Sequence, residues 1–322
     1  MSTPWQPVAT PAVLRLRAAL LAAVRDFFAA RGVLEVETPL LARATVTDPQ
    51  LASLATELSA PAIRCYLQTS PEFAMKRLLA AGSGDIFQLG RAFRDGEQGR
   101  WHNPEFTLLE WYRLGFDHHA LMDEVEALLT RLLGARLSAA TERLSYREAF
   151  ARALGVDPLA ASDAELLALS GARTGIEPAT LAGDRDACLD LLMATQVAPT
   201  LGRARISFVH AYPASQAALA RLVPGTPATA ARFEAYVEGV ELCNGFHELG
   251  NALEQRRRFN ADLARRAARG LPQPPLDERL LAALAAGLPD CAGVALGFDR
   301  VVMLAAGVQT LAEVLAFPLD SA

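Results

Sequence analysis

The stretch FRDGEQGRWHNPEFTLLEWYRLGF, residues 93–116, reads as the end of one strand, a long polar loop and a second strand. Alternation before the loop places five side chains on one face of the first strand: Ile86, Gln88, Gly90, Ala92 and Arg94. The second strand has a matching face with Phe106, Leu108, Glu110 and Tyr112. The loop carries more function-capable groups than a simple turn needs: Glu97, Arg100, His102 and Asn103. We therefore predict a hairpin whose one face and loop form a functional site.

The composition is typical of a globular enzyme, with 322 residues of which 52% are hydrophobic and 21% charged. The sequence has no run of about eighteen apolar residues, so we expect no membrane helix. Residues 1–11 lack the basic and apolar regions of a secretory signal. The net charge of −5 gives no electrostatic reason to expect nucleic acid as a partner. Reduced thiols in a cytoplasmic protein, and no zinc site, are indicated by four scattered cysteines: Cys65, Cys188, Cys243 and Cys291.

Hydrophobic periodicity and residues that end helices predict the other elements. We expect helices at 10–31, 71–81, 117–137 and 254–270, helical runs at 141–200, and strands at 33–41, 64–70 and 206–213. The glycines of residues 231–259 argue against one continuous helix there. Residues 293–307 read as a strand, a glycine junction at Gly297 and a helix that starts around Asp299.

Three features have an ordinary structural explanation beside a functional one. Lys76 is the only lysine among 31 basic residues, either because a guanidinium would not fit its place or as a chance survivor on a helix face. Glu72 would suit the first turn of a helix through the helix dipole, and also a binding role. For His118 and His119, a solvated helix start is preferred to a metal site, because adjacent residues point apart on a helix.

Four carboxylates, Glu234, Glu238, Glu241 and Glu248, lie in an otherwise apolar stretch that we expect to be rich in strand. Buried carboxylates are costly unless they hold a cation, so a functional role is preferred here. A bulge near Gly245 could bring Glu241 and Glu248 toward one site although their strand parity differs.

Arg300 lies in the first turn of a predicted helix, where its charge opposes the helix dipole. An anionic ligand at the helix start would explain an arginine in this position.

Taken together, these motifs resemble the class II aminoacyl-tRNA synthetases. Residues 93–106 are similar to motif two of that family, GVALGFDRVVML (293–304) to motif three, and GVLEVETPLL (32–41) to motif one, which lies at the dimer interface. TSPEFAMKRLL (69–79) and VELCNGFHEL (240–249) are similar to the lysyl branch. The resemblance implies an α+β fold with an antiparallel sheet flanked by helices, and a homodimer. It also implies one catalytic domain over 1–322, with a helical insertion at about 141–205.

Only about ten residues precede the first predicted helix, so we expect no N-terminal OB-fold that binds an anticodon. The chain therefore resembles truncated paralogues of lysyl-tRNA synthetase that modify elongation factor P. That resemblance implies ATP-dependent activation of (R)-β-lysine as an adenylate and its transfer to a lysine of elongation factor P, without tRNA. The alternatives are tRNA charging and a non-catalytic sensor that binds an amino acid or adenylate.

The resemblance also assigns nucleotide-binding roles to individual residues. As catalytic arginines, Arg94 would grip the α-phosphate and the attacking carboxylate, and Arg300 would hold the γ-phosphate. Phe106 would stack on adenine, and Glu234 and Glu241 would hold Mg²⁺, which prefers oxygen ligands. The other implied ATP contacts are Gly96, Glu97, His102, Asn103, Glu241, Leu242 and Gly297.

A lysine-like substrate carries two ammonium groups, and each needs a buried acceptor. The implied acceptors are Ser70 and Glu72 for the backbone amine, and Tyr112, Asn244 and Glu248 for the side-chain amine. Ala295 stands where lysyl-tRNA synthetases usually have glycine, and its methyl group could shift the preference from an α-amine to a β-amine.

The loop departs from the family at one position. Motif two usually reads FRxE, whereas residues 93–97 read FRDGE, with glycine in place of the glutamate. Either Glu97 reaches adenine from one position later, or the backbone at Gly96 does.

Overall fold

The structure is a computed structural model that describes residues 5–177, 180–181 and 183–322. The chain divides into two compact units. The first consists of Met1–Phe116 and Leu249–Ala322, and the second of Asp117–Glu248. The prediction of one catalytic domain over 1–322, with an insertion at about 141–205, stays a prediction, and residues 178–179 and 182 of that stretch lie outside the described residues.

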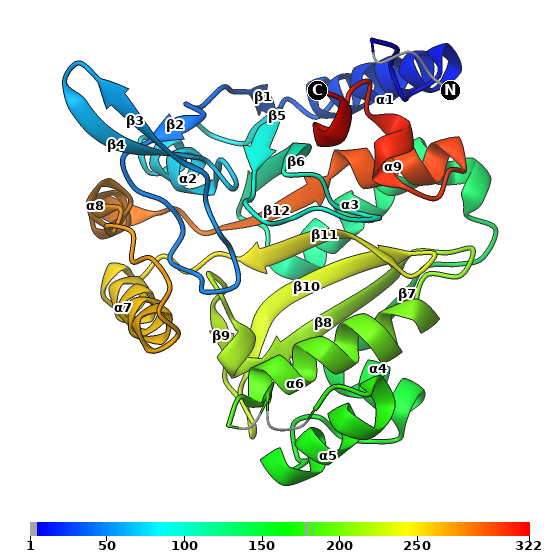
Figure 1. The fold of residues 1–322 in the computed structure, drawn as a ribbon, viewed down its shortest axis with the longest axis vertical. Helices are drawn as coiled ribbons and strands as arrows, with labels where there is room; N and C mark the ends of the chain where they lie inside the picture. The colour runs from blue at the N-terminus through cyan, green and yellow to red at the C-terminus, as the bar shows by residue number, and fades with distance from the viewer. Residues whose placement is uncertain (1–4, 178–179, 182) are drawn as a thin grey trace. The chain divides into compact units, whose positions relative to one another are not determined.

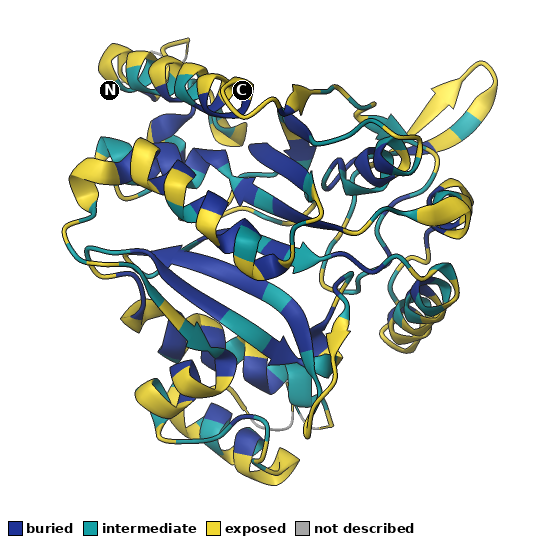
Figure 2. Cartoon of the chain, turned by 180° about the vertical axis from the view of Figure 1, so that it is seen from behind, coloured by how far each residue is buried: buried dark blue, intermediate teal, exposed yellow. Residues whose placement is uncertain are grey.

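In the first unit the sheet runs in the order β1, β5, β6, β12 (Figure 1). These strands are Leu34–Glu35, Ile86–Phe93, Glu105–Leu114 and Cys291–Gly297. β1 is parallel to β5, whereas β5, β6 and β12 are antiparallel neighbours. A smaller sheet joins β2 (Leu41–Ala42), β4 (Ala62–Leu67) and β3 (Ala55–Ser59). Its β3–β4 hairpin is largely exposed (Figure 2).

The helices of the first unit are α1 (Pro11–Ala29), α2 (Glu72–Ala80), α7 (Ala252–Ala268), α8 (Glu278–Gly287) and α9 (Phe298–Ala306). Thr10 caps α1 by accepting from the backbone N–H of Val13 at 3.3 Å, as its sequence predicts. Phe28 on the apolar side of α1 stacks on Phe87 of β5, with ring centroids 4.5 Å apart. Apolar periodicity thus fixes which side of α1 faces the sheet.

The predicted hairpin is confirmed. β5 and β6 pair in a register that sets Gln88 opposite Glu110, Ala92 opposite Phe106 and Ile86 opposite Tyr112. Residues directly opposite in an antiparallel pair project to the same side of the sheet. The two faces deduced from alternation are therefore one surface.

In the second unit the strand order is β11, β10, β8, β7, with β9 beside β10. Their bounds are Val240–His247, Thr229–Val237, Ser207–Pro213, Glu142–Ser145 and Leu222–Val223. The α-helices are α3 (His118–Leu133), α4 (Tyr146–Leu154), α5 (Asp163–Thr174) and α6 (Arg185–Leu192). Capping boxes start α4 at Ser145 and α5 at Ser162, which explains why these short helices begin where they do.

One prediction about local structure is wrong and another is confirmed. The strand expected at 33–41 is limited to the two residues of β1, with β2 beginning only at Leu41. The bulge expected near Gly245 is present on β11, where pairing moves from Ala235–Cys243 to Tyr236–Glu241 and leaves Leu242 as the extra residue. For residues 33–41 the sequence pattern identifies extended chain but not where the backbone finds hydrogen-bonding partners.

In the part of the chain that the structure describes, no helix is long and apolar enough to cross a membrane. All four cysteines are buried and free.

The expectation of a solvated start for the helix at 117–137 holds for His119, which is exposed, but not for His118. His118 is buried, and its ring centroid lies 4.1 Å from that of His119 and 6.5 Å from that of His247. His119 lies 5.5 Å from His210, so four of the five histidines of the chain form one cluster. The rule that adjacent residues of a helix point apart does not describe this pair well, because the two histidines are the first residues of α3 and follow the N-cap residue Asp117.

The histidine cluster predicts acid sensitivity. Burial, and next the neighbouring His119, lower the pKa of His118 to about 4, and burial lowers that of His210. The folded state therefore favours neutral imidazoles, so this stability is present above about pH 6.5 and is lost as the pH falls toward 4. Between pH 7.5 and 4.5 we expect His118→Leu to lose about 2 kcal/mol less unfolding free energy than the wild type, after allowance for solvent screening. Urea denaturation followed by circular dichroism measures this, and equal losses in both proteins would contradict it.

Gly202 packs against the turn between β10 and β11. Its φ is +73°, and a Cβ there would lie 2.6 Å from the Cα of Val237. We expect Gly202→Ala to lower the unfolding free energy by about 2–4 kcal/mol through overlap and backbone strain. Gly155→Ala is the matched control, because Gly155 has φ +70° but nothing within 4 Å of its Cβ position. Similar losses of unfolding free energy in the two variants, measured by thermal denaturation, would contradict this prediction, because they would mean that the backbone moves to relieve the overlap.

Candidate active site

The candidate site of the first unit lies along the face of β6 that carries Phe106, Glu110 and Tyr112. Phe106 and Tyr112 mark its two ends and are separated along the strand by about 20 Å at roughly 3.3 Å per residue. Cationic side chains gather near Phe106, and carboxylates gather near Tyr112.

At the first end, Arg94 lies over the ring of Phe106, with its guanidinium carbon 5.0 Å from the ring centroid. Its Nη1 reaches Glu97 at only 3.5 Å, and its buried Nε has no hydrogen-bond partner among the described residues. An unsatisfied buried guanidinium donor fits a ligand that carries oxygen anions. Arg94 and Phe106 are thus neighbours, while their contacts with ATP stay predictions.

Arg300 belongs to the first turn of α9, whose N-cap is Gly297, close to the start predicted from the sequence. Its Nη2 lies 2.8 Å from Nε2 of His102, and its Nε donates to the carbonyl of Trp101 at 3.4 Å. Burial, followed by the charge of Arg300, lowers the pKa of His102, so the ring is neutral at pH 7 and can accept from the guanidinium. Arg300 is therefore aimed at the motif-two loop.

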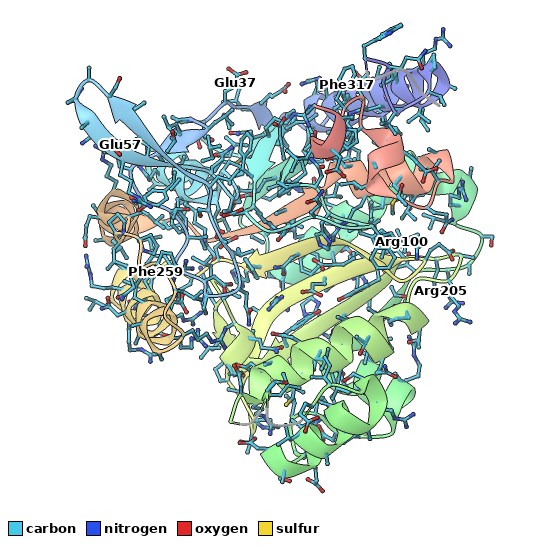
Figure 3. All side chains as sticks on the ribbon, viewed as in Figure 1. Glu37, Glu57, Arg100, Arg205, Phe259 and Phe317 are labelled. Atoms are coloured by element: carbon cyan, nitrogen blue, oxygen red, sulfur yellow. The ribbon has the colours of Figure 1, made fainter. Side chains whose placement is uncertain are left out.

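The loop is held by residues near the C-terminal end of the chain. Arg100, labelled in Figure 3, donates to the backbone and side-chain oxygens of Gln309 at 3.0 and 2.7 Å. Asn103 accepts from the backbone N–H of Leu319 at 3.2 Å. Its own Nδ2 donates to the carbonyl of Glu105 at 2.7 Å. Asn103 therefore shapes the loop, and its predicted contact with ATP is untested.

Gly96 has a structural reason to be glycine. Its φ is +75°, a left-handed conformation that side chains other than glycine rarely adopt. The sequence departure at this position therefore coincides with a turn that a glutamate would strain. Whether Gly96 or Glu97 contacts adenine stays open.

The contacts of Asp299, which hold the Phe106 end of the site together, were not identified from the sequence. Asp299, buried next to Arg300, pairs with Nη2 of Arg17 at 2.6 Å and accepts from the backbone N–H of Thr107 at 2.7 Å. Arg17 also donates to the hydroxyl of Thr107 at 2.7 Å. Arg17 sits on α1, and nothing in the periodicity of that helix marks it. The presence of Asp beside Arg300 in motif three was the available signal.

At the other end of β6, five side chains meet. Ser70 donates to Glu110 at 2.9 Å, and Tyr112 donates to the same carboxyl group at 2.7 Å. The hydroxyl of Ser70 also accepts from the backbone N–H of Glu72, so it caps the start of α2. Lys76, which is 1% exposed, donates to Glu72 at 2.6 Å. The single lysine thus lies on the buried face of α2 and takes part in an ion pair.

Ala295 belongs to this end. It lies on β12 directly opposite Glu110, on the side of β6 away from Gln88. The predicted substrate residues Ser70, Glu72, Tyr112 and Ala295 are thus brought together within the first unit, and Glu110 was identified only as a member of the strand face.

The remaining predicted site residues belong to the second unit. Glu234 is 7% exposed and is engaged through both oxygens: Arg232 donates to Oε1 at 2.6 Å, and Tyr212 to Oε2 at 2.6 Å. Tyr236 also donates to Oε2. These contacts place Glu234 as an ion-pair partner of Arg232 and do not favour a magnesium ligand. Because Arg232 lies two residues away on the same strand face, period-two alternation could have revealed this cation.

The other carboxylates of this stretch differ in their surroundings. Glu238 has φ +51° in the turn after β10 and accepts from the backbone N–H of Ala204 at 2.7 Å, which is a structural role. Asn244 accepts from Arg232 at 3.1 Å, and Leu242 and Glu248 are buried. Across the described ranges, no group of three or more His, Cys, Asp or Glu side chains is arranged to hold a metal. The roles assigned to Glu241, Leu242, Asn244 and Glu248 stay predictions.

Comparison with known proteins agrees with these motifs. The model for class II tRNA synthetases (D, K and N) matches residues 8–321. An elongation factor P–(R)-β-lysine ligase of Vibrio cholerae is 52% identical over 322 residues, which cover 99% of this chain and 98% of the relative. Enzymes with the same name from Salmonella typhimurium and Klebsiella pneumoniae are each 51% identical with the same coverage. These matches agree with the motif-two hairpin and show that the chain belongs to the class II tRNA synthetase family of D, K and N enzymes.

Proposed function

We propose that this protein is an ATP-dependent ligase that activates (R)-β-lysine as an adenylate and transfers it to a lysine of elongation factor P. One observation carries the proposal: guanidinium groups lie near one end of strand β6, and the carboxyl groups of Glu72 and Glu110 lie near its other end. That distribution suits a molecule with phosphate at one end and ammonium at the other. The full-length similarity to enzymes named as elongation factor P–(R)-β-lysine ligases supports this choice of substrate and acceptor.

In the first step an oxygen of the substrate carboxylate forms a bond to the α-phosphorus of ATP, and the bond to the bridging oxygen breaks to release pyrophosphate. Arg94 would orient the carboxylate and the α-phosphate, and Arg300 would hold the γ-phosphate, because guanidinium stays charged and binds oxygen pairs. In the second step the amine of the acceptor lysine bonds to the acyl carbon, AMP leaves, and the amine loses a proton.

The neutral ring of His102 keeps Arg300 oriented without adding a competing charge. Mg²⁺, when bound with ATP, neutralises phosphate charge. Glu241 and Glu234 stay the predicted carboxylates for it, and the oxygens of Glu234 also accept from Arg232, Tyr212 and Tyr236. We further propose that the protein is a homodimer, because residues 32–41 are similar to motif one, and that it is cytoplasmic. Sedimentation equilibrium would test the dimer.

The decisive assay offers purified protein, ATP and (R)-β-lysine or lysine to elongation factor P and, separately, to tRNA. We expect pyrophosphate exchange with (R)-β-lysine and a mass increase on elongation factor P, with no label on tRNA. Labelled tRNA beside an unmodified factor would favour tRNA charging. Absence of exchange with either amino acid would favour a sensor.

Arginine replacements test the phosphate end. We expect Arg94→Lys and Arg300→Lys each to lower kcat/KM for pyrophosphate exchange by about 10²–10³-fold, because an ammonium cannot reproduce the paired contacts of a guanidinium. Arg257→Lys on α7 is the control, since its side chain is 72% exposed and, among the described residues, pairs with Glu254 of the same helix. Activity within about twofold of the control in both site variants would contradict these roles.

A further inference from the structure

The carboxylate end of β6 is unbalanced in charge. We call Glu72, Lys76 and Glu110, with the hydroxyls of Ser70 and Tyr112, the Glu110 cluster. It holds two carboxylates and one ammonium, and Lys76 donates to Glu72 at 2.6 Å. Lys76 and Glu110 are 1% and 2% exposed. A second buried negative charge beside an existing ion pair is costly, and a carboxyl group avoids this cost by keeping its proton.

Glu110 is the member that lacks a cationic contact. In the described part of the first unit its two contacts are the hydroxyls of Ser70 and Tyr112, at 2.9 and 2.7 Å. Burial, followed by the charge of Glu72, raises the pKa of Glu110 to about 8, although both hydroxyl contacts and Lys76 act in the opposite direction. At pH 7 the carboxyl group is therefore mostly neutral in the protein without a ligand.

The same face also contains an unused acceptor. Gln88 lies opposite Glu110 on β5 and is 4% exposed, and its Oε1 has no hydrogen-bond partner among the described residues. Buried amide oxygens are normally satisfied, so this oxygen points to a ligand that donates hydrogen bonds. On β12, the residue opposite Glu110 is Ala295, which does not titrate. The charged groups that act most strongly on Glu110 are Glu72 and Lys76 of α2.

We propose that Glu110 holds a proton in the free protein and releases it when a substrate ammonium enters the Glu110 cluster. The inference rests on the proposed function, because it takes the substrate to be a diamino acid. The balance is simple: the substrate brings one positive charge to the cluster, the carboxyl O–H bond breaks, and the proton passes to the solvent. The cluster then contains two carboxylates and two ammonium groups.

This linkage makes the site select for protonated amines. A neutral amine or a hydroxyl in the same position cannot draw the proton from Glu110 and meets a neutral carboxyl group instead of an anion. Below pH 8, substrate affinity is expected to rise about tenfold for each unit of pH, because each binding event must displace one proton.

Isothermal titration calorimetry with (R)-β-lysine, at pH 7 in phosphate and in Tris, measures the protons released from the dependence of the heat on the buffer. We expect close to one proton for the wild type and none for Glu110→Gln, whose amide is close in shape to a protonated carboxyl group. Between pH 6 and 7 the affinity of the wild type should rise about tenfold, while that of Glu110→Gln stays constant. Glu57→Gln on the exposed strand β3, labelled in Figure 3, is the control and should release the same proton as the wild type.

Binding with a heat that does not depend on the buffer would overturn the proposal. Absence of any binding would count against the proposed function instead. A second measurement then decides, because it needs no ligand: a ¹³C NMR titration of protein labelled at the glutamate carboxyl groups. The signal missing from Glu110→Gln should titrate near pH 8, and a signal already ionised at pH 6 would refute the inference.

Discussion

The buried carboxylate of Asp299 is the contact on which the phosphate end of the site depends. It joins three elements, because it pairs with Arg17 of α1 and accepts from the backbone of Thr107 on β6 while lying in the first turn of α9. Removing one partner of such a buried pair leaves an uncompensated charge and typically costs about 3–5 kcal/mol. Since Arg300 is the next residue, the position of its guanidinium near His102 follows from this node and not from the loop alone.

The two ends of β6 differ in the charged groups that surround them. Near Phe106, Arg94 is only weakly paired, as its 3.5 Å contact with Glu97 illustrates. Near Tyr112 two carboxyl groups lie close together, and Lys76 is the counter-ion of one of them, Glu72. Neither arrangement maximises the stability of the free protein. Ionisable groups arranged in this way are characteristic of sites that bind a charged ligand.

The sequence predicts the elements of this fold better than their interactions. Alternation in residues 85–113 gave both strands and the face that they share, because period two is a property of the chain itself. It could not reveal that Arg17, some ninety residues away, donates to Thr107, since that contact depends on how α1 packs. The partner of Glu234 was accessible, because Arg232 is two residues away on the same strand. The burial of His118 was not, because helix periodicity says little about a residue at the helix end.

The ties between the motif-two loop and residues 309–320 have a consequence for the entropy of binding. Arg100, Asn103 and Gln98 are each hydrogen-bonded to that segment, the last to Asp320 at 2.8 Å. The loop is thus ordered before any nucleotide arrives, and the conformational freedom that a ligand would otherwise have to remove is already lost during folding. A preorganised loop leaves more of the contact energy available as affinity. If ATP binds at this loop as proposed, the distant end of the chain would contribute to its affinity without touching it.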